Sequence, residues 1–342
     1  MAMASEQEKT ASLRETDIRP DHLMAEQARL FALDVARLLE RKDEFVRVPC
    51  PACDASTSRP VFEKQGFSFE ECPECGTTFT NPRPTPEILD FYYETSENYK
   101  YWNKMIFPAS EEARRERLFR PRVDRVLEFC RRFGVGFGTF LEVGAGFGTF
   151  CEELGGRGVF QRIIAVEPTP DLVRSCRARG VEVFADTIER VRLPEESVDV
   201  VASFEVIEHL FRPEEFVSQC IRFLKPGGIL FLTCPNGQGF EVATLKEHAQ
   251  SVDPEHLNYF NPSSLSGLLE RKGLRILEVA TPGKLDAEIV RKRALSGVLD
   301  LSGQPFLRRV LLEEWERLGD RFQTFLGENG LSSHMWIVAR KG

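Results

Sequence analysis

The chain has 342 residues, of which 42% are hydrophobic and 29% are charged, and its formal net charge at pH 7 is −8. This length and composition are typical of a globular protein with one α/β domain and a smaller unit. The acidic balance argues against nucleic acid as a partner, because such binding needs clustered Lys and Arg. The sequence has no apolar run of about 18 residues and no apolar N-terminal signal, so we expect a cytoplasmic protein without membrane contact.

The N-terminal part is expected to consist of a tail and a helix. Residues 1–20 are polar and are predicted to form a disordered tail. Over residues 21–45 apolar side chains recur at helical spacing, which predicts an amphipathic helix. The apolar face of this helix is expected to dock on the rest of the chain or on another subunit of a homo-oligomer.

Two C-x-x-C pairs dominate residues 46–86 and predict a zinc-binding module. Cys50 and Cys53 form one pair, and Cys72 and Cys75 form the other. Four thiolates at this spacing suit a tetrahedral Zn²⁺ ion with a structural role, because a closed four-cysteine shell leaves no open position for catalysis. A module this small has too little core to fold without the metal. The alternative, a thioredoxin-type redox pair, would need a single C-x-x-C beside a βαβ unit.

Residues 87–135 are predicted to form a helical linker that leads into the main domain. Six aromatic residues lie near its start: Phe91, Tyr92, Tyr93, Tyr99, Tyr101 and Trp102. These side chains form either the wall of an acceptor pocket or, at helical spacing, a stripe that packs into the core.

Residues 136–342 are predicted to form an α/β domain with a doubly wound parallel sheet. Short β-rich runs alternate here with segments of helical spacing, and a helical insertion is expected at about 283–332. The seven expected strands cover residues 139–143, 162–167, 181–185, 198–205, 229–234, 274–280 and 334–340.

A glycine-rich loop follows the first of these strands. Gly144, Gly146 and Gly148 precede a predicted helix, so backbone amides and the positive helix end would face a ligand there. Glu167 ends the second strand and suits ribose hydroxyls. A dinucleotide fingerprint would need its third glycine one position later, where the chain has Thr149. The spacing therefore favours a nucleoside ligand without a pyrophosphate.

The run Leu-Glu-Val-Gly-Ala-Gly-Phe-Gly at 141–148, together with Glu167, the pair at 186–187 and LKPGGILFLTCPN at 224–236, resembles class I S-adenosylmethionine (SAM)-dependent methyltransferases. The resemblance covers about residues 110–280 and implies a Rossmann-like, seven-stranded sheet with SAM as cofactor. It implies cofactor contacts for Glu142, Gly144, Ala145, Gly146, Gly148, Glu167, Pro168, Asp186, Thr187, Phe204 and Glu205. Asp186 could instead cap a helix that begins there.

The fourth strand ends in Glu205-Val-Ile-Glu208-His209-Leu, at the sheet edge where α/β proteins bind ligands. This run resembles ubiquinone-pathway O-methyltransferases and small-RNA 2′-O-methyltransferases, in which the matching positions bind a divalent ion. The resemblance implies a cation held by Glu205, Glu208 and His209, which would acidify an acceptor hydroxyl. Alternatively, these side chains only fix the loop by hydrogen bonds.

A second cluster, Asp253-Pro-Glu255-His256-Leu-Asn-Tyr-Phe, follows the fifth strand. It resembles the E-H-x-x-Y-F motif of sugar C-methyltransferases, which also begin with a four-cysteine zinc module. The resemblance implies that His256 acts as the base and that Glu255 assists it, and a histidine suits this task near neutral pH. The motif at 205–210 and the shorter C-terminal part depart from those enzymes, which leaves C-methylation open. In the alternative interpretation, His256 caps a surface turn.

We therefore expect a SAM-dependent methyltransferase that acts on a small polar acceptor, such as a sugar, a nucleotide-sugar, or a glycan or secondary-metabolite precursor. Methylation of RNA or protein, with the zinc module as the recognition element, is the alternative function. A third hypothesis is a SAM-type fold kept as a non-catalytic scaffold.

Overall fold

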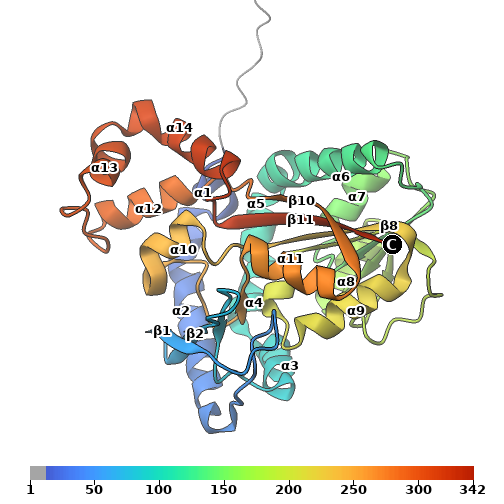
Figure 1. Cartoon of the computed structure of the whole chain (residues 1–342), viewed down its shortest axis with the longest axis horizontal. Helices are drawn as coiled ribbons and strands as arrows, with labels where there is room; N and C mark the ends of the chain where they lie inside the picture. Colours follow the sequence, from blue (N-terminus) through green and yellow to red (C-terminus); the bar gives the residue numbers. More distant parts are fainter. Residues whose placement is uncertain (1–12) are drawn as a thin grey trace, which may run out of the picture.

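A computed structural model of the protein describes residues 13–342 (Figure 1). Its first elements are α1 (Glu15–Ile18), α2 (Asp21–Leu39) and the 3₁₀ turn η1 (Lys42–Glu44). The sequence predicts a disordered tail over residues 1–20, but residues 13–20 are ordered and include α1. Residues 1–12 lie outside the described part. Glu15 is buried, and its carboxylate accepts a 2.7 Å hydrogen bond from Lys292. This ion pair and the burial of Leu13 order a segment that is polar in sequence.

Helix α2 docks on its own chain, one of the two outcomes expected for its apolar face. Val35 and Leu38 are buried in one core cluster with Phe67 and Phe69 of the cysteine module. The buried carboxylate of Asp34 accepts hydrogen bonds from the Ser96 hydroxyl and the Asn98 N–H, both 2.8 Å long. Side-chain packing and this polar contact therefore fix the helix between the module and the helical linker.

The cysteine module is a small antiparallel sheet that is completed from far along the chain. Its own strands are β1 (Arg59–Lys64), β2 (Phe67–Glu71) and β3 (Thr78–Thr80). A fourth strand, β9 (Asn258–Tyr259), pairs with β3, so the strand order is β1-β2-β3-β9. The module thus shares a sheet with the segment that directly follows His256.

The linker runs through alternating α-helical and π-helical turns, in chain order α3 (Pro86–Thr95), α4 (Glu97–Tyr101), η2 (Trp102–Ile106), α5 (Phe107–Arg114), η3 (Arg115–Phe119) and α6 (Arg120–Arg132). Each π turn precedes a helix whose second residue is proline, Pro108 or Pro121. Since proline lacks the N–H of the regular i→i−4 bond, a local widening of the helix at these positions is expected.

The main domain contains the predicted seven-stranded sheet, with strands β4 (Thr139–Val143), β5 (Arg162–Val166), β6 (Glu182–Phe184), β7 (Val198–Phe204), β8 (Leu224–Pro235), β10 (Leu274–Ala280) and β11 (His334–Lys341). The order is β10-β11-β8-β7-β4-β5-β6. The five strands from β8 to β6 are parallel, and β11 runs antiparallel to both of its neighbours. The Rossmann-like α/β fold expected from the sequence is confirmed.

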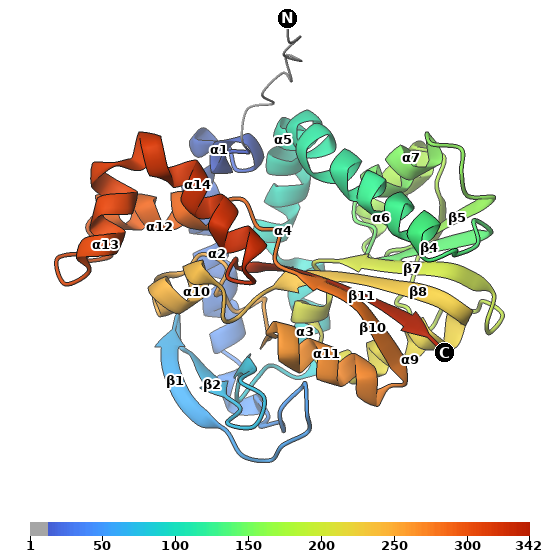
Figure 2. The same ribbon diagram turned by 45° about the horizontal axis from the view of Figure 1, so that its top comes forward.

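Helices cover both faces of this sheet (Figure 2). Helices α6 and α7 (Thr149–Gly155) lie on one face, and α9 (Pro213–Phe223) and α11 (Pro262–Arg271) lie on the other. Helix α8 (Pro170–Ala178) follows β5. Every residue of β7 is buried, which explains its nearly continuous apolar sequence. Chain order reverses between β4 and β7, and their carboxyl ends mark the expected ligand edge.

Two helical additions lie beside the sheet, at the left of Figure 1. After β8 come α10 (Phe240–Leu245) and η5 (Lys246–His248); between β10 and β11 come α12 (Asp286–Leu295), α13 (Pro305–Arg308), η6 (Arg309–Glu313) and α14 (Trp315–Glu328). The buried carboxylate of Asp286 accepts a 2.5 Å hydrogen bond from the Ser333 N–H, which anchors the second addition to the start of β11. Among residues 13–342, no helix is long and apolar enough to cross a membrane.

Candidate functional site

The glycine loop has the backbone conformation that its sequence requires. Gly144, Gly146 and Gly148 have φ values of +78°, +57° and +76°, which L-residues with a side chain adopt only at a cost. A Cβ at position 144 would lie 2.4 Å from Val206 Cγ2, and one at 148 would lie 2.9 Å from Cys176 Sγ. At position 146, in contrast, no described atom lies within 4 Å of such a Cβ. The loop is therefore packed at both ends and open in the middle.

The acid at the end of β5 is fixed against this loop. The Glu167 carboxylate accepts hydrogen bonds from the N–H groups of Gly146 and Thr169, each 2.9 Å long. Glu167 is 4% exposed, and burial raises its pKa. The predicted ribose-binding acid and the open middle of the glycine loop thus lie together.

Glu142, on β4, is also buried next to the loop. Its carboxylate accepts a 2.9 Å hydrogen bond from the Cys151 thiol, and burial raises its pKa to about 8. Arg122 lies near enough to act against this rise. Burial therefore favours the protonated form of Glu142.

The remaining predicted cofactor residues have varied environments. The Phe204 ring packs between Phe150 and Trp336, with centroids 4.8 and 6.1 Å away, so it belongs to the core. Ala145 is buried and Pro168 is exposed. The Asp186 carboxylate accepts a 2.9 Å hydrogen bond from the N–H of Thr187, but no helix begins there, so helix capping does not explain this aspartate.

Glu205 has partners outside its own motif. Its carboxylate accepts a 2.5 Å hydrogen bond from Thr233 and lies 2.9 Å from Nε2 of His334 and 4.0 Å from the Arg122 guanidinium. Partial burial would raise the pKa of Glu205, but His334, Arg122 and Thr233 together lower it to about 2. Sequence reasoning missed Arg122 and His334. His334 starts a predicted strand, and because this strand runs antiparallel to β8 its start lies at the ligand edge.

Glu208, His209 and His256 are brought together from two distant segments. Their ligand atoms all lie within 4.8 Å of one another, and the two imidazole centroids are 4.6 Å apart. Glu208 lies with His209 in the 3₁₀ turn η4 (Ile207–His209) and is 1% exposed. Neither of its carboxylate oxygens has a hydrogen-bond partner among the described residues. Glu205 is not part of this group, so the structure does not assemble the cation site implied at Glu205, Glu208 and His209.

The imidazoles of His209 and His256 each have one nitrogen within hydrogen-bonding distance of a backbone carbonyl. Nδ1 of His209 lies 3.0 Å from the Glu255 carbonyl oxygen, and Nδ1 of His256 lies 2.8 Å from that of Ser251. A carbonyl only accepts, so we assign the proton to Nδ1 in each ring, which leaves Nε2 with a lone pair. Burial and the neighbouring His256 lower the pKa of His209 to about 3, so this ring is neutral. Each ring therefore offers Nε2 as a metal ligand, and His256 can also act as a base, whereas the lowered pKa of His209 makes that ring a poor base.

The carboxylate beside the His256 ring is that of Asp253, not of Glu255. Asp253 Oδ2 lies 3.3 Å from His256 Nδ1, and Asp253 Oδ1 accepts a 2.9 Å hydrogen bond from the His256 N–H. The Glu255 carboxylate accepts hydrogen bonds from the Tyr92 hydroxyl and, at 3.2 Å, from the Asn98 amide. Burial and the nearby Asp253 raise the pKa of Glu255 to about 7. The expected Glu255–His256 pairing is thus replaced by an Asp253–His256 contact.

Some of the six aromatic residues near the start of the linker lie at the Glu208–His209–His256 group. The Tyr93 hydroxyl lies 3.3 Å from His209 Nδ1, and the Tyr99 ring packs edge-on against Tyr93. Phe91 is instead 51% exposed, and Trp102 packs against Phe107. Of the six aromatic residues, Tyr92, Tyr93 and Tyr99 therefore lie at the site. The two expected roles, a pocket wall and a packed stripe, are divided among the six.

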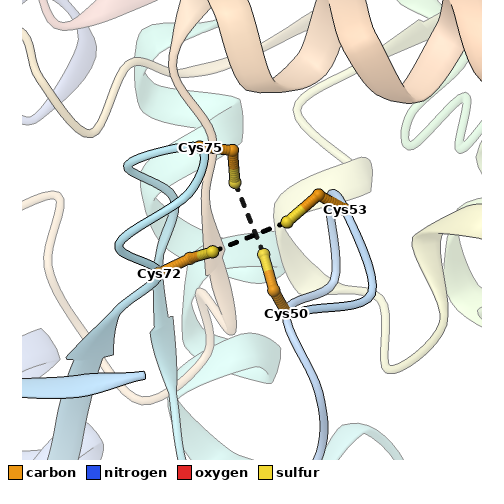
Figure 3. A group of neighbouring side chains, drawn as sticks. All are labelled: Cys50, Cys53, Cys72 and Cys75. Carbon is orange, nitrogen blue, oxygen red and sulfur yellow. Dashed lines mark hydrogen bonds between the residues drawn. The ribbon is translucent and has the colours of Figure 1, made fainter. Parts of the chain in front are cut away.

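The four predicted cysteines form one group (Figure 3). Sγ of Cys50 lies 3.5 Å from that of Cys75, the Cys53–Cys72 pair has the same separation, and all four sulfurs lie within 4.8 Å of one another. Zn–S bonds of about 2.3 Å in a tetrahedron place sulfurs about 3.8 Å apart, so the group fits Zn²⁺. Each C-x-x-C turn is closed by a 2.9 Å hydrogen bond. The Asp54 N–H donates to the Cys50 carbonyl, and the Gly76 N–H donates to the Cys72 carbonyl.

Comparison with known proteins identifies the middle of the chain. Residues 111–279 match the family described as "Methyltransferase domain". This segment is a methyltransferase domain. SAM as its cofactor follows from the family, and the glycine loop and Glu167 lie within the matched range. The cysteine module precedes the methyltransferase domain.

The curated relatives of the methyltransferase domain match only part of the chain. A "probable S-adenosylmethionine-dependent methyltransferase" of Mycolicibacterium smegmatis is 34% identical over 120 residues, which are 34% of this chain and 45% of the relative. The ubiquinone biosynthesis O-methyltransferase of Xanthomonas oryzae pv. oryzae is 29% identical over 133 residues, 35% of this chain and 56% of the relative. The chain thus spans about half the length of these relatives. A SAM-dependent methyltransferase structure from Archaeoglobus fulgidus shares 22% identity, with a TM-score of 0.46, over 66% of this chain and 94% of that one.

Proposed function

We propose that this protein transfers the methyl group of SAM to a hydroxyl or carbon of a small polar acceptor, such as a sugar, a nucleotide-sugar, or a glycan or secondary-metabolite precursor. The Glu208–His209–His256 group at the carboxyl edge of the sheet is the observation that carries this proposal. It lies near the cofactor loop, because Val206 packs against Gly144 and Glu208 follows two residues later.

The cofactor would lie along the glycine loop. The Gly146 position leaves open space, and Glu167 and Glu142 lie next to it. We assign the ribose to Glu167, the methionine part to the loop and Glu142, and the adenine edge to Asp186 and Thr187. SAM supplies an electrophilic methyl group on a sulfonium.

His256 would act as the base in this reaction. Its Nε2 has a free lone pair and can accept the acceptor proton as the methyl group moves in line. The Ser251 carbonyl fixes the ring, and the Asp253 carboxylate stabilises the imidazolium that forms. Tyr93 and Tyr99 would border the acceptor, because the Tyr93 ring lies beside His209 and the Tyr99 ring packs against Tyr93.

A second candidate mechanism is favoured by the two unpartnered oxygens of Glu208. A buried carboxylate without hydrogen bonds is costly, and a divalent cation held by Glu208, His209 and His256 would remove that cost. In this mechanism His256 is a ligand and the metal acidifies the acceptor hydroxyl. Metal analysis separates the mechanisms: Glu208→Gln loses one equivalent of metal if the cation binds there, and keeps the wild-type content if His256 is the base.

The cysteine module is proposed to hold one structural Zn²⁺ ion. RNA or protein as acceptor is the alternative, with the module as the recognition element. Since binding to RNA weakens steeply with salt, an affinity for the acceptor that hardly changes between low and high salt would exclude RNA.

Purified full-length protein with methyl-labelled SAM tests the main proposal. Calorimetry is expected to show binding of SAM and not of NAD⁺, and label is expected to enter one class in a panel of nucleotide-sugars, glycan precursors and phenols. Binding of NAD⁺ with no response to SAM would overturn the proposal.

A further inference from the structure

Arg83 is a buried cation with no acidic partner. Its side chain lies in the cysteine module and is 0% exposed. No carboxylate in the described part of the chain forms an ion pair with it. A buried charge that is not paired is costly unless other groups compensate it, so its surroundings require an explanation.

The Arg83 guanidinium binds three backbone carbonyls from three segments. Nε donates to Thr80 at 3.1 Å, one terminal nitrogen donates to Phe211 at 3.4 Å, and the other donates to Leu257 at 3.2 Å. Thr80 belongs to β3, Phe211 follows His209 by two residues, and Leu257 directly follows His256. One side chain therefore connects the cysteine module to both segments that carry the histidine pair.

Backbone bonds around Leu257 complete the same connection. The Thr80 N–H donates to the Leu257 carbonyl at 3.0 Å, and the Leu257 N–H donates to the Glu208 carbonyl at 2.8 Å. The Asn258 amide donates to the Leu210 carbonyl at 2.8 Å. The segment after His256 is thus held between the module on one side and the turn with Glu208 and His209 on the other.

A second cation of the module holds the start of the same loop. Lys64 of β1 donates to the carbonyl of Ala249 at 2.6 Å and to that of Val252 at 2.5 Å. Burial lowers the pKa of Lys64. Residues 249–258 are therefore held at both ends by cations from the cysteine module.

Negative charge on the cysteine group would favour the buried Arg83 cation. Burial lowers the pKa of Arg83 to about 9, and Cys50 acts against this fall. Four thiolates with one Zn²⁺ ion carry a net charge of −2, so an occupied module favours the charged guanidinium and its three hydrogen bonds.

We propose that Arg83 is a positioning residue that couples the zinc-loaded cysteine module to the Glu208–His209–His256 group. Through this coupling, metal in the module keeps the two histidine rings in their relative positions. The catalytic part of this inference rests on the proposed function, whereas the coupling itself does not. By linkage, Arg83 must stabilise metal binding as much as metal binding stabilises the contacts of Arg83.

Arg83→Lys tests the coupling, because it keeps the charge and loses the fork that reaches three carbonyls. Arg59→Lys is the matched control: Arg59 lies in the same module, but its side chain is 69% exposed and pairs with Glu71. Zinc release to a chelator and hydrogen exchange of peptides covering 205–212 and 253–260 are measured on full-length proteins. Since coupling energies usually correspond to about 5- to 150-fold, we expect both rates to rise by at least about fivefold in Arg83→Lys only.

Zinc release and exchange rates equal to those of the control would overturn the coupling. Lys64→Met provides a second test, in which faster exchange of residues 249–253 is expected. For the catalytic part, Arg83→Lys is expected to lower kcat while the affinity for SAM stays at the wild-type level. If no acceptor is methylated by the wild type, the proposed function fails, while the zinc and exchange measurements still decide the coupling.

Discussion

The imidazole rings of His209 and His256 lie 4.6 Å apart, and each turns its Nδ1 toward a backbone carbonyl. His209 lies in the turn that follows β7, His256 lies just before β9, and Nε2 of each ring has a free lone pair. This arrangement makes the pair a chemical unit, with Glu208 as its third member.

Replacing His256 is expected to remove turnover and spare cofactor binding. His256→Ala deletes the proposed base, and base catalysis contributes about 10²- to 10⁴-fold, so kcat is expected to fall by that factor. Calorimetry with SAM should give the wild-type dissociation constant. His248→Ala is the control, because His248 is an exposed histidine of the same region. Wild-type turnover in His256→Ala would remove this residue from the mechanism.

Substitution at Gly146 tests the place of the cofactor. Gly146→Ala and Gly134→Ala introduce a Cβ at φ values of +57° and +62°, and neither Cβ meets a described atom within 4 Å. Each is expected to cost about 1–2 kcal/mol of stability through backbone strain. Only Gly146→Ala is expected to weaken SAM binding in calorimetry, because its methyl group enters the proposed ligand space. Equal affinities in the two variants would place SAM elsewhere.

The cysteine group is expected to bind one Zn²⁺ ion that supports folding. Cys53→Ser should lose one equivalent of zinc by elemental analysis and lower the midpoint of thermal unfolding, because zinc binding in such modules contributes about 10 kcal/mol or more. Cys234→Ala is the control, since Cys234 is buried in β8, away from the group. Full zinc content in Cys53→Ser would contradict a four-cysteine site.

Glu142 is expected to make stability depend on pH. Its folded pKa of about 8 exceeds the ordinary 4.5, so between these values the folded state binds a proton that the unfolded state does not. The free energy of unfolding therefore falls as pH rises through this window, by at most about 1.4 kcal/mol per pH unit for one group. Glu142→Gln should flatten this part of the profile in urea unfolding at pH 5.5 and 7.5. Parallel profiles of variant and wild type would show that Glu142 ionises normally.

The sequence predicts the parts of this structure that depend on local patterns. The strands of the seven-stranded sheet are apolar runs bounded by turn residues, and each was expected near its observed position. The glycine loop at 144–148 and the cysteine group follow from short motifs with characteristic spacing.

Contacts between distant segments could not be predicted in this way. Strand β9 has two residues and no periodicity, so nothing in the sequence indicated that it pairs with β3. That pairing helps to place His256 beside Glu208 and His209. Asp253, rather than Glu255, lies against His256 because of how the loop folds back on itself. Glu205 has two such partners: Arg122 comes from a linker helix, and His334 comes from the last strand.

The pairing of β9 with β3 also means that the two parts of the chain cannot be separated cleanly. A fragment that starts after residue 86 would leave Asn258 and Tyr259 without a neighbouring strand and would expose the Tyr259 ring, which now packs edge-on against Phe69. We therefore expect that a shortened version intended for crystallisation or engineering would need to begin before Cys50. The methyltransferase segment is likewise expected to depend on the cysteine module for its stability, so that a graft of this segment onto another protein would need both parts.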